Sequence, residues 1–156
     1  MSNELIISST PDGERIALLQ DKRLVEYHVD AHDTPYAVGD IFLGTIKKVM
    51  PGLNAAFVDS GYDKDAFLHY GDLGEQFPVL DRFVQDVRRG KHQTPSLKAY
   101  GPDAQPLDKL GKAADVLKKG QSVVVQILKE PISTKGPRLT CDLSLAGRYL
   151  VLVPFS

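Results

Sequence analysis

The sequence has a single cysteine and no long apolar run, and each shortage excludes a class of protein. Cys141 stands alone among 156 residues, so the chain cannot build an internal disulfide framework, and this usage suits a reducing compartment. No stretch of apolar residues approaches the length of a membrane span. The opening MSNELIISSTPDGER lacks a basic start followed by an apolar run. We therefore expect no secretory signal and a cytoplasmic location.

Recognisable metal and nucleophile motifs are also missing. The four histidines are dispersed, and with one cysteine they indicate neither a zinc site nor a Cys–His nucleophile. Asp59, Asp63 and Asp65 follow one another closely, but they lack the loop spacing and the terminal Glu of a calcium hand. A solvated hairpin loop is the better interpretation of these aspartates. We predict no catalytic and no metal-binding residue in this chain.

Composition is ordinary for a soluble globular protein, with 42% hydrophobic and 25% charged residues. The net charge of −1 conceals an uneven distribution: residues 1–39 hold three basic and seven acidic side chains, and the other 117 residues hold 16 and 13. The balance is thus −4 before residue 40 and +3 after it. An anionic partner would favour the second part, although a chance distribution explains the asymmetry equally well.

Short β-prone segments dominate the chain and predict a mainly β protein. The first part, residues 1–39, has a β-meander pattern with strands over residues 5–8, 15–19 and 24–29 and a turn at Thr10-Pro11-Asp12-Gly13. From residue 40 to 143, five short segments with little helix favour a small closed barrel over alternating β-α-β units. These segments are residues 41–49, 53–59, 65–69, 122–129 and 138–142.

An insertion over residues 74–119 interrupts the barrel pattern. Apolar residues recur at helical spacing from Val79 to Val87, and Gly90 offers a stop, so the insertion is expected to be partly helical. A second short helix fits residues 112–117, and GKHQTPSLKAYGPDAQP between them is punctuated by Pro and Gly and predicted to be mobile. Residues 144–156 contain RYLVLVPFS, which predicts a strand leading into a downstream region missing from this chain.

Two phenylalanines in the barrel segments are predicted to point outward. Side chains alternate across a strand, so Phe57 shares a face with Asp59, and Phe67 shares one with Asp65 and His69. The opposite faces carry only Ala, Val and Leu. An aromatic face mixed with polar residues is typical of rings that stack on a ligand. The alternative is that both rings are buried at one end of the barrel.

A nucleobase is the usual partner for exposed Phe and His beside lysines, because stacking holds the base and nearby cations hold the phosphates. The candidate cations are Lys47, Lys129, Lys135 and Arg138. Taken singly, each is as well explained as a solvated surface charge. The RNA-binding hypothesis depends on their convergence with the two rings.

Several segments in order resemble the amino-terminal portion of the bacterial ribonuclease E/G endoribonucleases. They are AAFVDSG, KEPISTKG and SLAGRYLVL, within two longer similar stretches that cover nearly the whole chain except residues 75–115. The resemblance implies that the barrel is an S1 domain, an OB-type fold that binds single-stranded RNA. It also implies that the amino-terminal meander is part of an RNase H-like subdomain.

Individual residues take expected roles from this resemblance. Phe57, Phe67 and Lys135 match the RNA-contacting residues of the family, and His69 matches a histidine of S1 domains in general. Gly147 and Val151 match part of a pocket that senses a 5′-monophosphate through backbone groups.

The resemblance implies single-stranded RNA binding and substrate positioning for an endoribonuclease that acts in RNA processing and decay. Hydrolysis would belong to a later domain that holds Mg²⁺, followed by a cysteine pair that binds Zn²⁺ between subunits of a homo-oligomer. This chain, with no cofactor of its own, should then be inactive alone. Two alternatives stay open: a standalone RNA-binding module of the S1 or cold-shock type, and an assembly segment whose Phe face meets protein.

Overall fold

The computed structural model describes residues 2–10, 13–30, 36–91 and 105–154. The chain forms two compact units, residues 1–35 and 36–156. The predicted turn at Pro11-Asp12 and most of the GKHQTPSLKAYGPDAQP segment lie outside the described residues. Within the described part, no helix is both long enough and apolar enough to cross a membrane.

The first unit is the predicted β-meander. Its strands are β1 (Asn3–Thr10), β2 (Gly13–Gln20) and β3 (Arg23–Asp30), paired antiparallel in that order. Asp21 and Lys22 join β2 to β3 with φ angles of 47° and 65°, the positive values that a two-residue type I′ hairpin requires. Seven apolar side chains of this small sheet are more than half exposed: Leu5, Ile6, Ile7, Leu24, Val25, Tyr27 and Val29.

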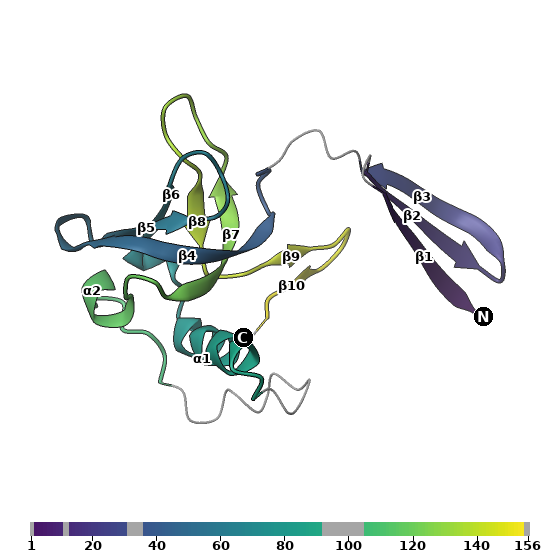
Figure 1. Cartoon of the computed structure of the whole chain (residues 1–156). Coiled ribbons are helices and arrows are strands. Elements are labelled where there is room, and N and C mark those ends of the chain that lie inside the picture. Colours follow the sequence, from purple (N-terminus) through teal and green to yellow (C-terminus); the bar gives the residue numbers. More distant parts are fainter. Residues whose placement is uncertain (1, 11–12, 31–35, 92–104, 155–156) are drawn as a thin grey trace. The chain divides into compact units, whose positions relative to one another are not determined.

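The second unit is built on a closed barrel of five strands (Figure 1). The strands are β4 (Ile41–Met50), β5 (Ala55–Asp59), β6 (Ala66–His69), β7 (Ser122–Lys129) and β8 (Arg138–Thr140). They neighbour one another in the order β4-β5-β6-β8-β7, and β7 closes onto β4. Only β6 and β8 run parallel among these pairs. The predicted mainly β fold with an OB-type barrel is confirmed.

Alternating apolar side chains fill the barrel and leave the other face of each strand outside. Ile46, Val58, Leu68, Val125 and Leu139 are essentially inaccessible to solvent. β4 crosses β5 so closely at Gly44 that a Cβ atom there would lie 2.5 Å from Cγ1 of Val58. A side chain at this position would displace the core, which is why a glycine interrupts an otherwise β-prone segment.

The insertion adds α1 (Phe77–Arg88) and the single turn α2 (Ala113–Val116), as the helical pattern predicts. Phe77, Leu80 and Val84 of α1 are buried in the same apolar cluster as the barrel interior. Two short 3₁₀ helices flank the barrel strands, η1 (Pro51–Leu53) and η2 (Tyr70–Asp72). After η1, the side chain of Asn54 accepts a hydrogen bond from the Ala113 N–H at 2.7 Å and thereby fastens α2 to the barrel.

The RYLVLVPFS segment contains the predicted strand as the two-residue β10 (Val151–Leu152). β10 pairs with β9 (Leu145–Ala146) in a short hairpin, closed by a hydrogen bond from the Gly147 N–H to the Leu150 carbonyl at 2.8 Å. β-Propensity reports which residues suit a strand but not where the backbone reverses, so the sequence did not predict the turn or β9.

Candidate nucleic-acid interface

The two phenylalanine rings lie outside the barrel, as strand alternation predicts. Their neighbours on the opposite face are fully buried: Ala56, Val58, Ala66 and Leu68. Phe57 and Phe67 are partly exposed and face each other in register across β5 and β6. Their ring centroids are 6.0 Å apart, with 67° between the planes. Neither ring belongs to the buried apolar core of the barrel.

The rings are the centre of a row of residues that crosses all five strands. Strand register places Lys48 on β4 opposite Phe57, Phe67 opposite Arg138 on β8, and Arg138 opposite Lys129 on β7. Adjacent strands lie about 4.8 Å apart, so this cross-strand row extends over roughly 19 Å. Two aromatic side chains are thus flanked by cations at both ends.

Sequence alternation did not identify Lys48. The register between β4 and β5 shifts between Ile46 and Lys48, which makes room for one extra residue at Lys47. Such a bulge reverses the alternation, so Lys48 aligns with the outward Phe57 while Val49 aligns with the buried Ala56. No residue type in IKKVM signals the shift.

A groove of about 790 Å³ runs beside the two rings. It brings together five of the predicted RNA-binding residues: Phe57, Phe67, Lys129, Lys135 and Arg138. Its other lining residues are Leu53, Lys64, Asp65, Thr134 and Gly136. Residues more than 70 positions apart in the chain therefore meet in one concave surface, and four of its five charged residues are basic.

The segments around Lys64 and Lys135 both line the groove, and hydrogen bonds join them. The Phe67 N–H donates to the Pro137 carbonyl at 2.8 Å, and the Lys64 ammonium donates to the Ser133 carbonyl. A Cβ atom on Gly136 would lie 2.2 Å from the Asp65 carbonyl oxygen. A side chain at position 136 has no room, because the backbone of Asp65 already occupies that space.

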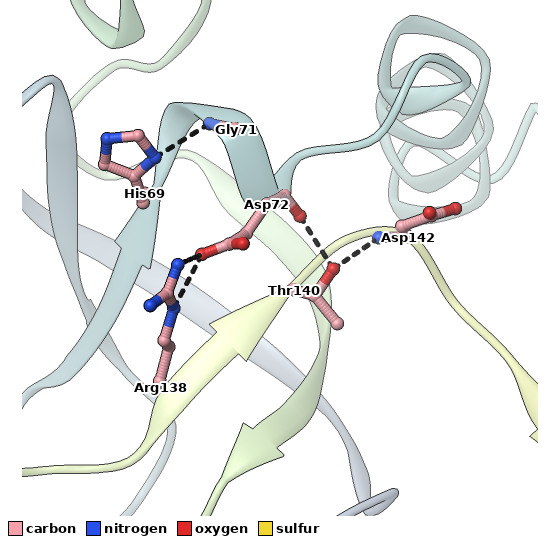
Figure 2. Close-up of polar contacts among 6 residues, drawn as sticks. All are labelled: His69, Gly71, Asp72, Arg138, Thr140 and Asp142. Atoms are coloured by element: carbon pink, nitrogen blue, oxygen red, sulfur yellow. Dashed lines mark hydrogen bonds and ion pairs between the residues drawn. The ribbon is translucent and has the colours of Figure 1, made fainter.

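Arg138 lines the groove, but its charge has a partner. Its Nε and Nη2 atoms each lie 2.8 Å from Oδ2 of Asp72 (Figure 2). The Thr140 hydroxyl donates to the backbone carbonyl of Asp72 at 2.7 Å and holds η2 against β8. Asp72 lies 66 positions from Arg138, and no local pattern in the sequence predicts this pair.

Lys47 also has a partner, Asp65, whose Oδ1 atom lies 2.5 Å from the Lys47 ammonium. The hydrogen bond to Asp65, reinforced by its negative charge, raises the pKa of Lys47 above its usual value. Among the described residues, no carboxylate forms an ion pair with Lys129 or Lys135. The predicted cations thus divide into a paired set and a set available to an anionic ligand.

The structure places His69, Gly147 and Val151 away from the lining of the groove. Nδ1 of His69 accepts a hydrogen bond from the Gly71 N–H at 3.0 Å, so the ring caps η2 (Figure 2). Gly147 and Val151 belong to the β9–β10 hairpin, where the Gly147 N–H is already bonded to Leu150. Their part in sensing a 5′-monophosphate stays a prediction.

Within the described ranges, no three side chains of His, Cys, Asp or Glu are grouped so that they could hold a metal ion. Cys141 is buried, and that burial raises the pKa of its thiol far above neutrality. A buried thiol of this kind is inert as a nucleophile.

These features define a class: an OB-type barrel whose outer face carries paired rings in a basic groove, an arrangement typical of single-strand nucleic-acid binders. No protein-family model matches the chain. It is 34% identical over 154 residues to "Ribonuclease G" of Salmonella typhimurium, covering 99% of this chain and 27% of that protein. Another relative, "Ribonuclease E/G-like protein" of Porphyra purpurea, is 35% identical over all of this chain and 24% of its own length.

A third relative, "Ribonuclease G" of Haemophilus influenzae, is 34% identical over 97% of this chain and 27% of its own length. Relatives named ribonuclease G and ribonuclease E/G-like thus match 97–100% of this chain, in agreement with the resemblance that the sequence motifs carry. The chain spans about a quarter of the length of these curated relatives.

Proposed function

We propose that this chain binds single-stranded RNA along the groove and positions it as a substrate. The observation that carries the proposal is the cross-strand row, in which Phe57 and Phe67 lie between Lys48 on one side and Arg138 and Lys129 on the other. Rings supply stacking surfaces that accept any base, and cations supply attraction to the backbone. Both kinds of group are needed for binding that tolerates different sequences.

The geometry of the rings supports a specific mode of binding. Because their planes are inclined at 67°, one flat base cannot stack on both rings. Two bases of one strand would instead divide between them, each stacking with a gain of ~1–3 kcal/mol. Lys135 and Lys129, which line the groove beside the rings, would then contact the intervening phosphates.

The parent protein, in this proposal, is an endoribonuclease of the ribonuclease E/G type that acts in RNA processing and decay. This rests on relatives named ribonuclease, of which the chain matches about a quarter. Cleavage would depend on residues outside this chain, together with the Mg²⁺ expected there, and Zn²⁺ would join subunits of a homo-oligomer. The groove would contribute by holding the substrate strand in place.

A salt-titrated binding measurement tests the proposal. Fluorescence anisotropy of a labelled single strand of about 12 nucleotides, within the usual site size of an OB fold, is compared with that of the same sequence as a duplex. We expect tighter binding of the single strand and an affinity that falls linearly on a log–log scale between about 50 and 200 mM salt.

The two other functions predict different results. An assembly segment whose Phe face contacts protein would bind neither the single-stranded nor the duplex RNA. Its contact with a protein partner would be nearly insensitive to salt. A standalone RNA-binding module would show the same groove binding, but the natural full-length protein would not cleave RNA. Absence of single-strand binding by folded chain would refute the proposal.

A further inference from the structure

Two carboxylates hold two of the cations beside the groove, and the two ion pairs differ in their surroundings. In the Lys47–Asp65 pair the side chains are 50% and 43% exposed. In the Arg138–Asp72 pair they are 41% and 16% exposed. The first pair is therefore accessible from both sides, whereas the acidic member of the second is largely enclosed.

Asp72 is held by several contacts beyond its carboxylate. Its backbone carbonyl accepts hydrogen bonds from the Thr140 hydroxyl and from the Cys141 N–H at 2.8 Å. Its Oδ2 atom is the partner of two guanidinium nitrogens of Arg138, Nε and Nη2. Removing this carboxylate would disturb the join between η2 and β8, so the pair with Arg138 is a structural feature of the barrel.

Asp65 differs because only its backbone is locked. The Asp65 carbonyl oxygen packs against Gly136, which fixes the main chain at the groove wall. Asp65 is one of the residues that line the groove, and its Oδ1 atom lies on Lys47, which is not itself among them. A carboxylate at this position presents a negative charge in the place where an RNA phosphate would approach.

We propose that Asp65 limits the affinity of the groove for RNA by occupying Lys47, so that a phosphate must displace its carboxylate to reach that lysine. This inference rests on the proposed RNA-binding function and names a specificity-determining residue of the same groove. Displacement leaves Asp65 facing the bound strand, and the repulsion between them weakens binding and hastens release. Exposed ion pairs are weak enough for a ligand to open them.

Asp65→Asn tests the proposal because it removes the charge and keeps the size of the side chain. We expect the variant to bind the single-stranded oligonucleotide about two- to fivefold more tightly at low salt, the range that an exposed ion pair spans. Without the competing carboxylate, Lys47 is open to a phosphate in every complex and not only where the ion pair has opened, so the slope of log affinity against log salt should steepen, by at most roughly 0.7. Asp65→Ser, which also removes the charge, should show the same two changes.

Asp63→Asn is the matched control. Asp63 lies exposed in the same loop and is not part of the groove lining. Its substitution by Asn removes the same formal charge as Asp65→Asn. Lys47→Ala supplies the second arm: it should abolish the gain in the Asp65→Asn background. Thermal melts of each variant identify the folded fraction to which the affinities refer.

The outcomes separate this inference from the function on which it rests. Equal gains from Asp63→Asn and Asp65→Asn, or a gain that survives Lys47→Ala, would mean general charge reduction and overturn the role of Asp65. Unchanged affinity in Asp65→Asn, with binding still lost in Phe57→Ala, would overturn it while the proposed function stands. Folded chain that binds no RNA, with or without Asp65, refutes both.

Discussion

Phe57 and Phe67 meet edge to face on the outside of the barrel, with centroids 6.0 Å apart across β5 and β6. Edge-to-face contact is a favoured arrangement of aromatic pairs, so each ring orients the other without the support of a core. The pair is therefore pre-formed before any ligand arrives. A binding surface that is already rigid loses less conformational entropy on association.

Phe57→Ala should weaken binding of single-stranded RNA by ~1–3 kcal/mol, because one stacking surface disappears. The free energy of unfolding should fall by less than the ~3–5 kcal/mol that truncating a core ring costs, since the edge-to-face contact with Phe67 and some partly buried area are lost but no core cavity forms. Anisotropy titrations and denaturant melts measure the two quantities. Tyr27→Ala, an exposed aromatic substitution in the first unit, is the control and should leave RNA affinity unchanged. A stability loss of ~3–5 kcal/mol with unaltered affinity would identify Phe57 as a core residue.

Lys135→Ala should weaken binding about equally for RNAs of different sequence. Lys135 lines the groove, so it is placed to neutralise a phosphate. Its loss should flatten the slope of log affinity against log salt by roughly 0.7, the single-strand value for one phosphate. Binding isotherms at several salt concentrations, for a pyrimidine-rich and a purine-rich strand, give both numbers. Weaker binding with an unchanged slope would mean that Lys135 shapes its loop without touching phosphate.

Arg138→Ala, unlike Lys135→Ala, should lower the free energy of unfolding and leave the salt dependence of RNA binding almost unchanged. Its guanidinium is engaged with Asp72, so we expect a loss of roughly 1–2 kcal/mol in unfolding free energy, reduced from the usual range for charged hydrogen bonds because Arg138 is partly exposed. The salt slope should stay close to that of the natural chain. Arg138→Lys is the comparison, since it keeps the charge but loses the two-nitrogen contact. A flattened slope of log affinity against log salt, with unchanged stability, would contradict this prediction. It would show that Arg138 leaves Asp72 and contacts a phosphate when RNA binds.

Gly136→Ala should disrupt the groove wall although it adds a single methyl group. The new Cβ would lie 2.2 Å from the Asp65 carbonyl, so the two loops must separate. Overpacking of this kind costs about 1–3 kcal/mol, and RNA affinity should fall with it. Thermal melting and anisotropy on the same samples check both effects. Gly52→Ala is a suitable control, because nothing lies within 4 Å of a Cβ placed there. Unaltered melting of Gly136→Ala would contradict the close approach.

Purified chain should not cleave RNA when incubated with labelled single strand and excess Mg²⁺. Metal-assisted hydrolysis needs carboxylates grouped around the ion, and the described residues contain no such group. Gel analysis of the labelled strand over time measures the outcome. Asp59→Asn and Asp63→Asn are prepared in parallel. Cleavage that co-purifies with the chain and disappears in either variant would place a catalytic site in the β5–β6 loop.

Local sequence was enough to predict the strands and the outward direction of the rings. The alternation of side chains around Phe57 and Phe67 depends only on the two-residue period of a strand, so it can be predicted without knowledge of the fold. The spacing from Val79 to Val87, followed by Gly90, likewise predicted α1, because helix periodicity and a left-handed stop are local properties. The family motifs extended these local patterns to an OB-type barrel, which the structure confirms.

Only the tertiary structure decided which basic side chains near the groove are free to contact an anionic ligand. Lys47 and Arg138 read as free cations in the sequence, but closure of the barrel sets each beside a carboxylate from a distant segment, Asp65 and Asp72. The sequence likewise does not predict the bulge that aligns Lys48 with Phe57, because the bulge arises from how β4 pairs with β5. Strand propensity is a property of neighbouring residues, whereas charge pairing and register depend on which segments the fold brings together. The sequence by itself thus determined the aromatic face, and only the closed barrel determined its electrostatics.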